Sequence, residues 1–208
     1  MNLRGDAFLK TTTITFDYNF YKNTVEINAE IVSPIADYAF NYYRYKLEGV
    51  FYDNRGNLIN KIKVIPRREN DRVFSGFIFI VEDQWRLYGL ELSVTGSQIQ
   101  TPAANLVTIK QNLSYDQTAD YWVIRSQTIG FKYGFLGFNG DGSFVANYSN
   151  YELNTNFGSN VFTNEVLAFE LEANKKDSIY WNTLRPVPLT SEELVDYIRK
   201  DSLQVLKK

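Results

Sequence analysis

The sequence predicts a mainly β protein, with one large curved antiparallel sheet or open half-barrel and two C-terminal helices. Three observations predict this class. Tyr and Phe, which favour strands, number 15 each among 208 residues. Short segments that alternate with a period of two residues recur from about residue 12 to residue 148. Helical spacing appears only after about residue 160. A β-sandwich is the alternative arrangement of the same strands.

The first predicted hairpin lies near the N-terminus. The segment "TITFDYNFY" ends at Tyr21 and "VEINAEIV" begins at Val25, with "KNT" between them. Both segments alternate apolar and polar residues, as half-buried strands do. We therefore expect one strand on each side of "KNT".

The second predicted hairpin is formed by "YYRYKLEGVFYD" and "LINKIKVIP", which flank "NRGN". Gly56 in this connection suits a turn position with positive φ. A cation-binding loop is the poorer interpretation, because the further carboxylate that it needs is absent. The alternation predicts two groups of apolar side chains that each share a face: Tyr45, Leu47 and Phe51 on the first strand, and Ile62 and Val64 on the second.

Five more segments complete the predicted sheet: residues 74–83, 84–94, 104–115, 121–138 and 142–151. We expect a tight turn at Glu82 and Asp83, and a β-bulge at Gly89, where the alternation is interrupted. The segment "NGDG", from Asn139 to Gly142, has the composition of a hairpin turn. A phosphate-binding loop is less favoured there, because a strand rather than a helix follows the glycines.

The C-terminal part has a different pattern. Residues 163–181 have helical spacing without Gly or Pro. "RPVP" cannot continue this helix, because proline lacks an N–H and restricts the residue before it. Thr190 and Glu193 form a capping box that begins a second helix. The predicted organisation is a β domain of residues 1–160, followed by a helix, an Arg-Pro-Val-Pro spacer and a second helix in residues 161–208.

Composition removes most kinds of catalytic site. The chain has no Cys and no His, so thiolate and imidazole ligands, Cys nucleophiles and His general bases are excluded. We predict no catalytic, metal or cofactor site, and we expect the protein not to be an enzyme. A net charge of -2 gives no general attraction for nucleic acid. The sequence has neither an apolar run of about 20 residues nor an N-terminal signal peptide, which is expected of a fragment or a cytosolic protein.

Two clusters have both a structural and a functional interpretation. Residues 37–46 contain five aromatic side chains, for which core packing is favoured over sugar stacking or a lipid-lined surface. For the basic segment "KIKVIPRRENDR", a solvent-exposed face of a sheet is the favoured interpretation. A binding site for lipid head groups or polyanions is the alternative. The cations of this segment are Lys61, Lys63, Arg67, Arg68 and Arg72.

Several segments resemble a known family. They are "SPIADYAFNYYRYKLEG" (33–49), residues 60–92, "GFLGFNGDGSFVANYSNYELN" (134–154) and residues 164–202, where "YW…RPVPLT" is the most specific part. They are similar to the middle region of Bacteroidota outer-membrane proteins described as carboxypeptidase-regulatory-like-domain proteins of unknown function. More loosely, the strand pattern of residues 43–95 resembles periplasmic lipoprotein-carrier proteins, an analogy of fold only.

The resemblance implies a place and a role. In that family this region lies between an N-terminal β-sandwich and a C-terminal outer-membrane β-barrel, both outside this sequence. It implies a non-catalytic domain at the periplasmic face of the outer membrane that supports or gates its own barrel or holds a client. A lipid or lipoprotein binding module and a carbohydrate-binding or carbohydrate-active protein are the alternatives.

The candidate docking site lies in "YWNTLRPVP". Its residues are Trp181, Leu184, Arg185, Pro186 and Pro188. A structural role is favoured, in which Trp181 and Leu184 anchor the helix end and Arg185 binds terminal carbonyl groups. The functional alternative is a stiff proline strut that sets the angle between this domain and the barrel.

Overall fold

The computed structural model describes residues 18–117, 120–135, 138–153 and 155–158, and isolated positions between 176 and 195. The chain divides into two units, one of Ile14–Asn156 and one of Met1–Thr13 with Phe157–Lys208. All nine strands that the structure describes belong to the first unit.

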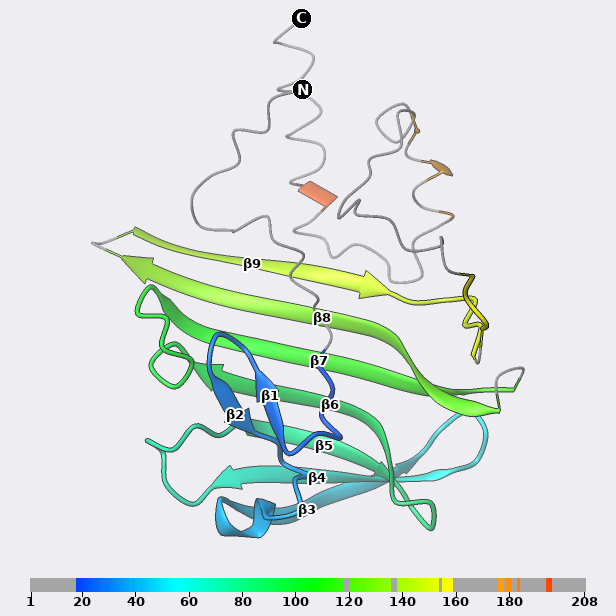
Figure 1. Ribbon diagram of the computed structural model, residues 1–208, viewed down its shortest axis with the longest axis horizontal. Coiled ribbons are helices and arrows are strands. Elements are labelled where there is room, and N and C mark those ends of the chain that lie inside the picture. Colours follow the sequence, from blue (N-terminus) through cyan, green and yellow to red (C-terminus); the bar gives the residue numbers. More distant parts are fainter. Residues whose placement is uncertain are drawn as a thin grey trace, which may run out of the picture. The chain divides into compact units, whose positions relative to one another are not determined.

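The main sheet is an antiparallel meander of seven strands in chain order (Figure 1). Its strands are β3 (Tyr43–Tyr52), β4 (Leu58–Pro66), β5 (Ser75–Val81), β6 (Arg86–Thr95), β7 (Ala104–Asp116), β8 (Tyr121–Phe135) and β9 (Phe138–Asn147). Among the described strands β3 and β9 form the two edges, so the sheet is open. The predicted large antiparallel sheet is confirmed.

The hairpin of β3 and β4 follows the prediction except at one residue. Gly56 has φ +82°, as the turn requires. Tyr45 and Leu47 lie opposite Val64 and Ile62, which confirms their shared face. The register then shifts between Leu47 and Gly49, because Glu48 is an additional residue on β3. Phe51 therefore lies opposite Ile59 and on the other face, so its predicted grouping is wrong.

The hairpin of β5 and β6 confirms the predicted turn and bulge. β5 ends at Val81 and β6 begins at Arg86, with Glu82 and Asp83 between them. The register shifts where Phe79 and Ile80 lie opposite Gly89 and Leu87. Tyr88 is thus the additional residue, next to the predicted position.

The predicted turn at "NGDG" is wrong. β8 ends at Phe135 and β9 begins at Phe138, so the residues of "NGDG" lie within β9. A Cβ atom at Gly142 would lie 2.6 Å from Cζ of Phe131, and one at Gly140 would overlap the Tyr133 ring. The glycines therefore make room for aromatic rings on the neighbouring strand.

The first predicted hairpin is also wrong. "VEINAEIV" is not one strand: it contains the last two residues of β1 (Thr24–Glu26), a turn and β2 (Glu30–Val32). Asn28 makes this turn possible because Asn tolerates the left-handed conformation, here at φ 64°. Its side-chain amide also donates to the Ile99 carbonyl at 3.1 Å. The described end of the preceding segment, from Tyr18 to Tyr21, is not a strand.

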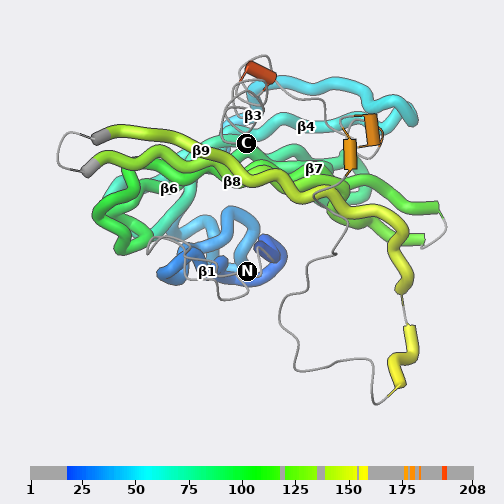
Figure 2. Tube along the Cα trace, turned by 90° about the horizontal axis from the view of Figure 1, so that it is seen from above, coloured from blue at the N-terminus to red at the C-terminus, as the bar shows by residue number. Residues whose placement is uncertain are grey.

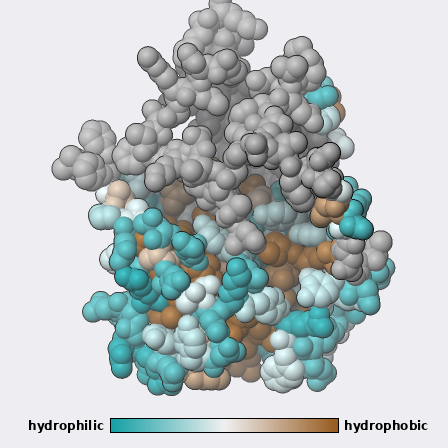
Figure 3. Space-filling model, viewed as in Figure 1, coloured by the Kyte–Doolittle hydropathy of each residue, from teal (hydrophilic) through white to brown (hydrophobic). Residues whose placement is uncertain are grey.

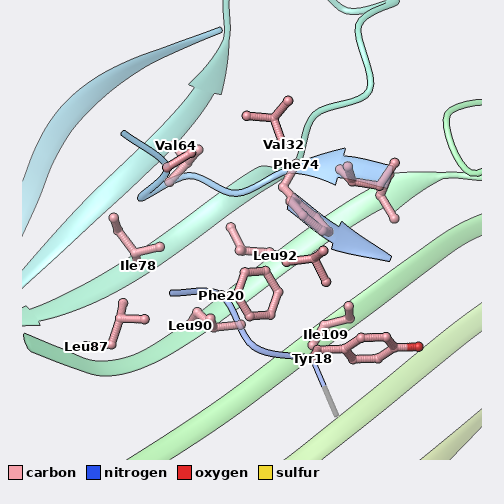
Figure 4. Close-up of a cluster of buried hydrophobic side chains, with 14 of the residues drawn as sticks. Tyr18, Phe20, Val32, Val64, Phe74, Ile78, Leu87, Leu90, Leu92 and Ile109 are labelled. Carbon is pink, nitrogen blue, oxygen red and sulfur yellow. The ribbon is translucent and has the colours of Figure 1, made fainter. Parts of the chain in front are cut away.

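The N-terminal segment, residues 18–36, covers one face of the main sheet, which we call the packed face (Figures 1 and 2). Phe20 is 2% exposed, and its ring lies 5.3 Å from the ring of Phe74. Figure 4 shows these rings above apolar side chains of β4, β5, β6 and β7. The buried side chains of the packed face include Val64, Ile78, Leu90, Leu92 and Ile109. In Figure 3 hydrophobic residues reach the surface in the middle of this face, with hydrophilic residues around them.

Hydrogen bonds tie the N-terminal segment to the sheet. The buried Tyr43 hydroxyl donates to the Val32 carbonyl at 2.5 Å and accepts the Phe74 N–H at 2.9 Å. Gln111 donates to the Tyr18 carbonyl at 2.7 Å and to the Gln127 side chain at 2.6 Å. These bonds satisfy buried backbone groups that would otherwise destabilise the fold. Burial raises the pKa of the Tyr43 hydroxyl well above its ordinary value, although the Phe74 N–H opposes the shift.

The two predicted C-terminal helices lie almost entirely outside the described residues. Ile179, Tyr180 and Thr183 are helical, but Lys176 and Asp177 are not. The Asp177 carboxylate accepts the Tyr180 N–H at 2.8 Å, as an N-cap does. The helix predicted for residues 163–181 is therefore interrupted at Lys176 and Asp177, and residues 163–175 lie outside the described part of the chain.

Candidate functional site

The structure does not describe the docking residues that the sequence predicts. Trp181, Leu184, Arg185, Pro186 and Pro188 all lie outside the described residues.

The aromatic cluster of residues 37–46 is mainly structural. Tyr43 is fully buried, and Tyr45 packs against it with 6.2 Å between ring centroids. Burial raises the pKa of Tyr45 to about 12, and its hydroxyl donates to the Pro34 carbonyl. Phe40 is the exception, because it is 74% exposed although its ring contacts Tyr45.

The basic segment divides between two roles. Arg67 is structural, because its Nε donates to the carbonyls of Phe40 and Tyr43. Lys61 and Lys63 lie on the face of β4 away from the N-terminal segment. The Lys61 ammonium lies 4.3 Å from the ring centroid of Phe77.

A second aromatic group, which sequence reasoning missed, lies at one end of the sheet. The β3–β4, β5–β6 and β7–β8 connections share this end (Figure 1). Each presents one exposed aromatic residue: Tyr52 is 71% exposed, Trp85 is 73% exposed and Tyr121 is 57% exposed. We call these three residues the tip aromatics. The available signal was an aromatic residue in or beside every second turn of the meander.

The backbone at Trp85 is unusual. Its φ is 53°, in the left-handed region that bulky residues rarely adopt. The turn holds it there: the Trp85 N–H donates to the Val81 carbonyl at 3.0 Å, and Glu82 N–H donates to the Leu58 carbonyl at 2.8 Å. A smaller polar residue would fit this turn with less strain. The aromatic side chain is therefore not explained by the turn itself.

Behind the tip aromatics, five rings form a continuous series of contacts that we call the ring chain. In order, its members are Phe79, Phe51, Tyr88, Trp122 and Tyr115. Successive ring centroids lie 6.1 to 6.4 Å apart, and all four contacts are edge-to-face. This is a preferred geometry for aromatic pairs. The ring chain joins the ends of the three hairpins into one packed support.

A pocket of about 400 Å³ opens at this end of the sheet. Its lining residues are Gln84, Arg86, Tyr115, Asp120 and Trp122. The Tyr115 hydroxyl donates to the Asp120 carboxylate, and this bond raises the pKa of Tyr115. Aromatic surface, an amide and one charge of each sign suit a polar ligand better than an apolar one.

Most carboxylates at this end are bonded within the domain. Asp53 accepts the N–H groups of Arg55 and Asn57 at 2.9 and 2.8 Å. Glu82 accepts from the Asn60 amide, and Asp116 pairs with Arg125 at 3.0 Å. Asp120 likewise accepts a hydrogen bond from Tyr115. Of these carboxylates only Asp116 is paired with a cation, and Asp83 is exposed.

Two cations accompany the aromatic residues. The Arg55 guanidinium lies 5.7 Å from the ring centroid of Tyr115, within the range of a cation–π contact. Arg86 follows Trp85 and lines the pocket. Neither arginine is in an ion pair among the described residues. The end therefore combines exposed aromatic rings with two arginines and several carboxylates.

The part of the chain that the structure describes contains no group of three or more residues arranged as metal ligands. Nor do its helical residues belong to a helix long and apolar enough to cross a bilayer.

Comparison with known proteins identifies one family. The model of a family of unknown function, DUF5686, matches residues 2–151, which include every strand described above. The matched range ends before the "YWNTLRPVP" segment. No curated protein and no solved structure matches the chain.

Proposed function

The chain belongs to the family of unknown function DUF5686, and from that premise we propose that it is a non-catalytic periplasmic domain that supports an outer-membrane barrel. In this proposal the tip aromatics contact the membrane–water interface beside the barrel. The observation that carries it is the presence of exposed Tyr52, Trp85 and Tyr121 in or beside the three turns at one end of the sheet.

The chemistry of this end supports an interfacial contact. Trp and Tyr are enriched where a membrane meets water, because their rings are apolar at one end and polar at the other. Arg55 and Arg86 would meet lipid phosphates, since positive charge near a membrane surface attracts anionic head groups. The left-handed backbone at Trp85 supports the same view, because strain of this kind is commonly kept for function.

The support behind the tip aromatics suits a structural role. The ring chain links the three hairpin ends, so a force applied at one turn is passed to its neighbours through packed side chains. The resemblance of residues 33–49, 60–92 and 134–154 to outer-membrane proteins of Bacteroidota supports placing a barrel after this domain. That barrel would be its partner.

Vesicle flotation tests the proposal. The 208-residue protein should float with vesicles of phosphatidylethanolamine and phosphatidylglycerol. A triple variant, Tyr52→Ser with Trp85→Asn and Tyr121→Ser, should bind about tenfold more weakly, because three aromatic contacts are lost.

The control is Phe40→Ser, which removes an equally exposed ring next to the start of β3. It should bind as well as the unchanged protein. Equal loss in both variants, or flotation that ignores the tip aromatics, would contradict the interfacial contact.

The pocket favours a second candidate, carbohydrate binding. Tyr115 and Trp122 offer aromatic surface, and Gln84, Arg86 and Asp120 offer hydrogen bonds around it. Gln84→Ala with Arg86→Ala should abolish any glycan binding found on an array while leaving flotation with uncharged vesicles intact. Silence of the unchanged protein across the array would remove this candidate.

The lipid or lipoprotein alternative receives less support. A carrier of that kind holds its ligand on the inner face of a curved sheet. In this protein the packed face of β4 to β7 is already occupied by the chain's own Phe20 and Phe74. A lipid would have to displace the N-terminal segment together with its hydrogen bonds to Tyr43 and Gln111.

A further inference from the structure

We propose that the outer edge of β3 binds an extended polypeptide in which acidic and apolar residues alternate. The site would add a strand to the sheet beside β3. It shares only Tyr52 with the tip aromatics and goes beyond the function proposed above.

The first observation is an unused sheet edge. β3 is ten residues long, and none of the described strands pairs with its outer side. A long edge strand presents unpaired N–H and C=O groups that can pair with another chain. Binding by strand addition uses these groups for affinity and alternate side chains for specificity.

The hydrogen-bond pattern identifies which groups point outward. Arg67 N–H donates to the Tyr42 carbonyl, and Asp53 N–H donates to the Asn57 carbonyl. Because bonded and outward residues alternate along an antiparallel strand, the outward backbone groups belong to four residues. These are Tyr45 and Leu47 before the bulge, and Val50 and Tyr52 after it. Tyr43 is not available in the same way, because its carbonyl accepts from Arg67.

The second observation is a strip of positive charge on one side of this edge, which we call the basic strip. It consists of Arg44 and Lys46 on β3, and Lys61 and Lys63 on β4. Lys46 lies directly opposite Lys63, a like-charge pair that destabilises a sheet. An anion between these ammonium groups would relieve the repulsion.

The single carboxylate on these two strands does not neutralise the strip. Glu48 lies in the bulge, and its Oε1 is 3.1 Å from the Lys46 ammonium. The hydrogen bond with Lys46, followed by the charges of Lys46, Lys63 and Lys61, lowers the pKa of Glu48. Four cations and one carboxylate leave a clear excess of positive charge.

The other side of the edge is apolar. Leu47 is 59% exposed and Val50 is 54% exposed, and both lie on the side away from the basic strip. An added strand would therefore place every second side chain beside Leu47 and Val50. The remaining side chains would lie beside Arg44 and Lys46. The two sides together select a sequence that alternates apolar and acidic residues.

A second copy of the chain is a poor occupant. Pairing β3 with another β3 would bring Arg44 and Lys46 of both copies onto neighbouring strands, with no acid to offset them except Glu48. Lysines and bulges on edge strands commonly prevent such self-pairing. The same lysines attract an acidic strand, so protection from self-association and selection of a partner have one cause.

Fluorescence anisotropy tests the site with two labelled peptides of about eight residues. One alternates Glu and Val, and the other alternates Lys and Val. The 208-residue protein should bind the Glu–Val peptide and not the Lys–Val peptide at low salt, with binding weakened as salt rises. Reversing the strip with Lys46→Glu and Lys63→Glu should weaken Glu–Val binding by about tenfold and allow Lys–Val binding.

A proline substitution distinguishes strand addition from simple attraction between charges. Val50→Pro removes an outward N–H without breaking a bond to β4, and proline is tolerated on edge strands. It should weaken Glu–Val binding by about tenfold, whereas Val50→Ala, which keeps the N–H, should change it by less than about threefold. Leu47→Pro removes the other central outward N–H and serves if Val50→Pro does not fold.

Two results would overturn the proposal. If the proline variants bind the Glu–Val peptide as the unchanged protein does, the basic strip is an anion site without strand addition. If phosphatidylglycerol vesicles displace the peptide, and the Lys46→Glu and Lys63→Glu variant loses vesicle binding while Val50→Pro keeps it, the strip is a site for lipid head groups. Slower hydrogen exchange at Leu47 and Val50 upon peptide binding is the positive signature.

Discussion

Two groups of aromatic residues on the same sheet differ in almost every physical property. On the packed face, Phe20, Phe74 and Tyr43 are at most 2% exposed, and the Tyr43 hydroxyl makes two backbone hydrogen bonds. At the hairpin ends, Tyr52, Trp85 and Tyr121 are all more than half exposed. The first group stabilises the fold. The second contributes little to it, and its position is better explained by contact with something outside the domain.

The difference shows how little residue type says about role in this chain. Tyr and Phe are abundant because they suit strands, and Tyr occurs in both groups. The packed face is distinguished by the N-terminal segment that lies over it. Substitutions in the two groups should therefore have very different effects on stability.

The largest effect is expected for Phe74→Ala. Phe74 is fully buried against Phe20, so the substitution removes a large contact and leaves a cavity. The free energy of unfolding should fall by about 3–5 kcal/mol, as measured by urea denaturation. Phe40→Ala is the matched control, and its exposed ring should cost less than about 1 kcal/mol. Similar losses in both variants would mean that the packed face is not the main core.

High pH should destabilise the packed face by a smaller amount. Burial raises the pKa of Tyr45 to about 12, and it raises the pKa of Tyr43 and Tyr18 as well. The folded state therefore holds these protons more tightly than the unfolded state, whose tyrosines titrate near pH 10. The stability is fully present below about pH 10 and is lost as the pH rises toward 12.

Urea denaturation between about pH 8 and pH 11.5 measures this loss. Tyr45→Phe removes one of the raised groups, so the free energy of unfolding should fall less steeply with pH. Tyr52→Phe, which alters an exposed ring of the other group, should leave the slope unchanged. A steeper fall in Tyr45→Phe than in the unchanged protein would contradict the assignment.

The strands of the main sheet could be predicted because each has its own alternating pattern. β3 to β8 lie where the alternation places them, and Gly56 and Gly89 correctly indicate a turn and the neighbourhood of a bulge. The prediction of which side chains share a face was wrong where it depends on the pairing with a neighbouring strand. Glu48 becomes an additional residue only in its pairing with β4, and Phe51 changes face as a result.

Predictions from residue type were wrong where the same residue type occurs both in turns and in strands. Gly140 and Gly142 resemble a turn, but they lie in β9 because the rings of Tyr133 and Phe131 lie over them. Asn28 resembles a strand residue, but it forms a turn through positive φ and a bond to a carbonyl 71 positions away. The tip aromatics were missed for a different reason: only the meander brings three separate turns to one end of the sheet.

The smallest effect on stability, and one of opposite sign, is expected for Trp85→Asn. Asn adopts the left-handed conformation more readily than Trp, so the backbone strain at φ 53° should decrease. The side chain that is lost is 73% exposed. We therefore expect the free energy of unfolding to stay the same or rise by about 0.5–1 kcal/mol in urea denaturation.

The same variant should weaken flotation with vesicles. A fall of more than about 1 kcal/mol would mean that Trp85 belongs with the packed aromatics, and the contrast between the two groups would not hold. A gain in stability together with a loss of membrane binding is hard to explain unless this residue is kept for its contact.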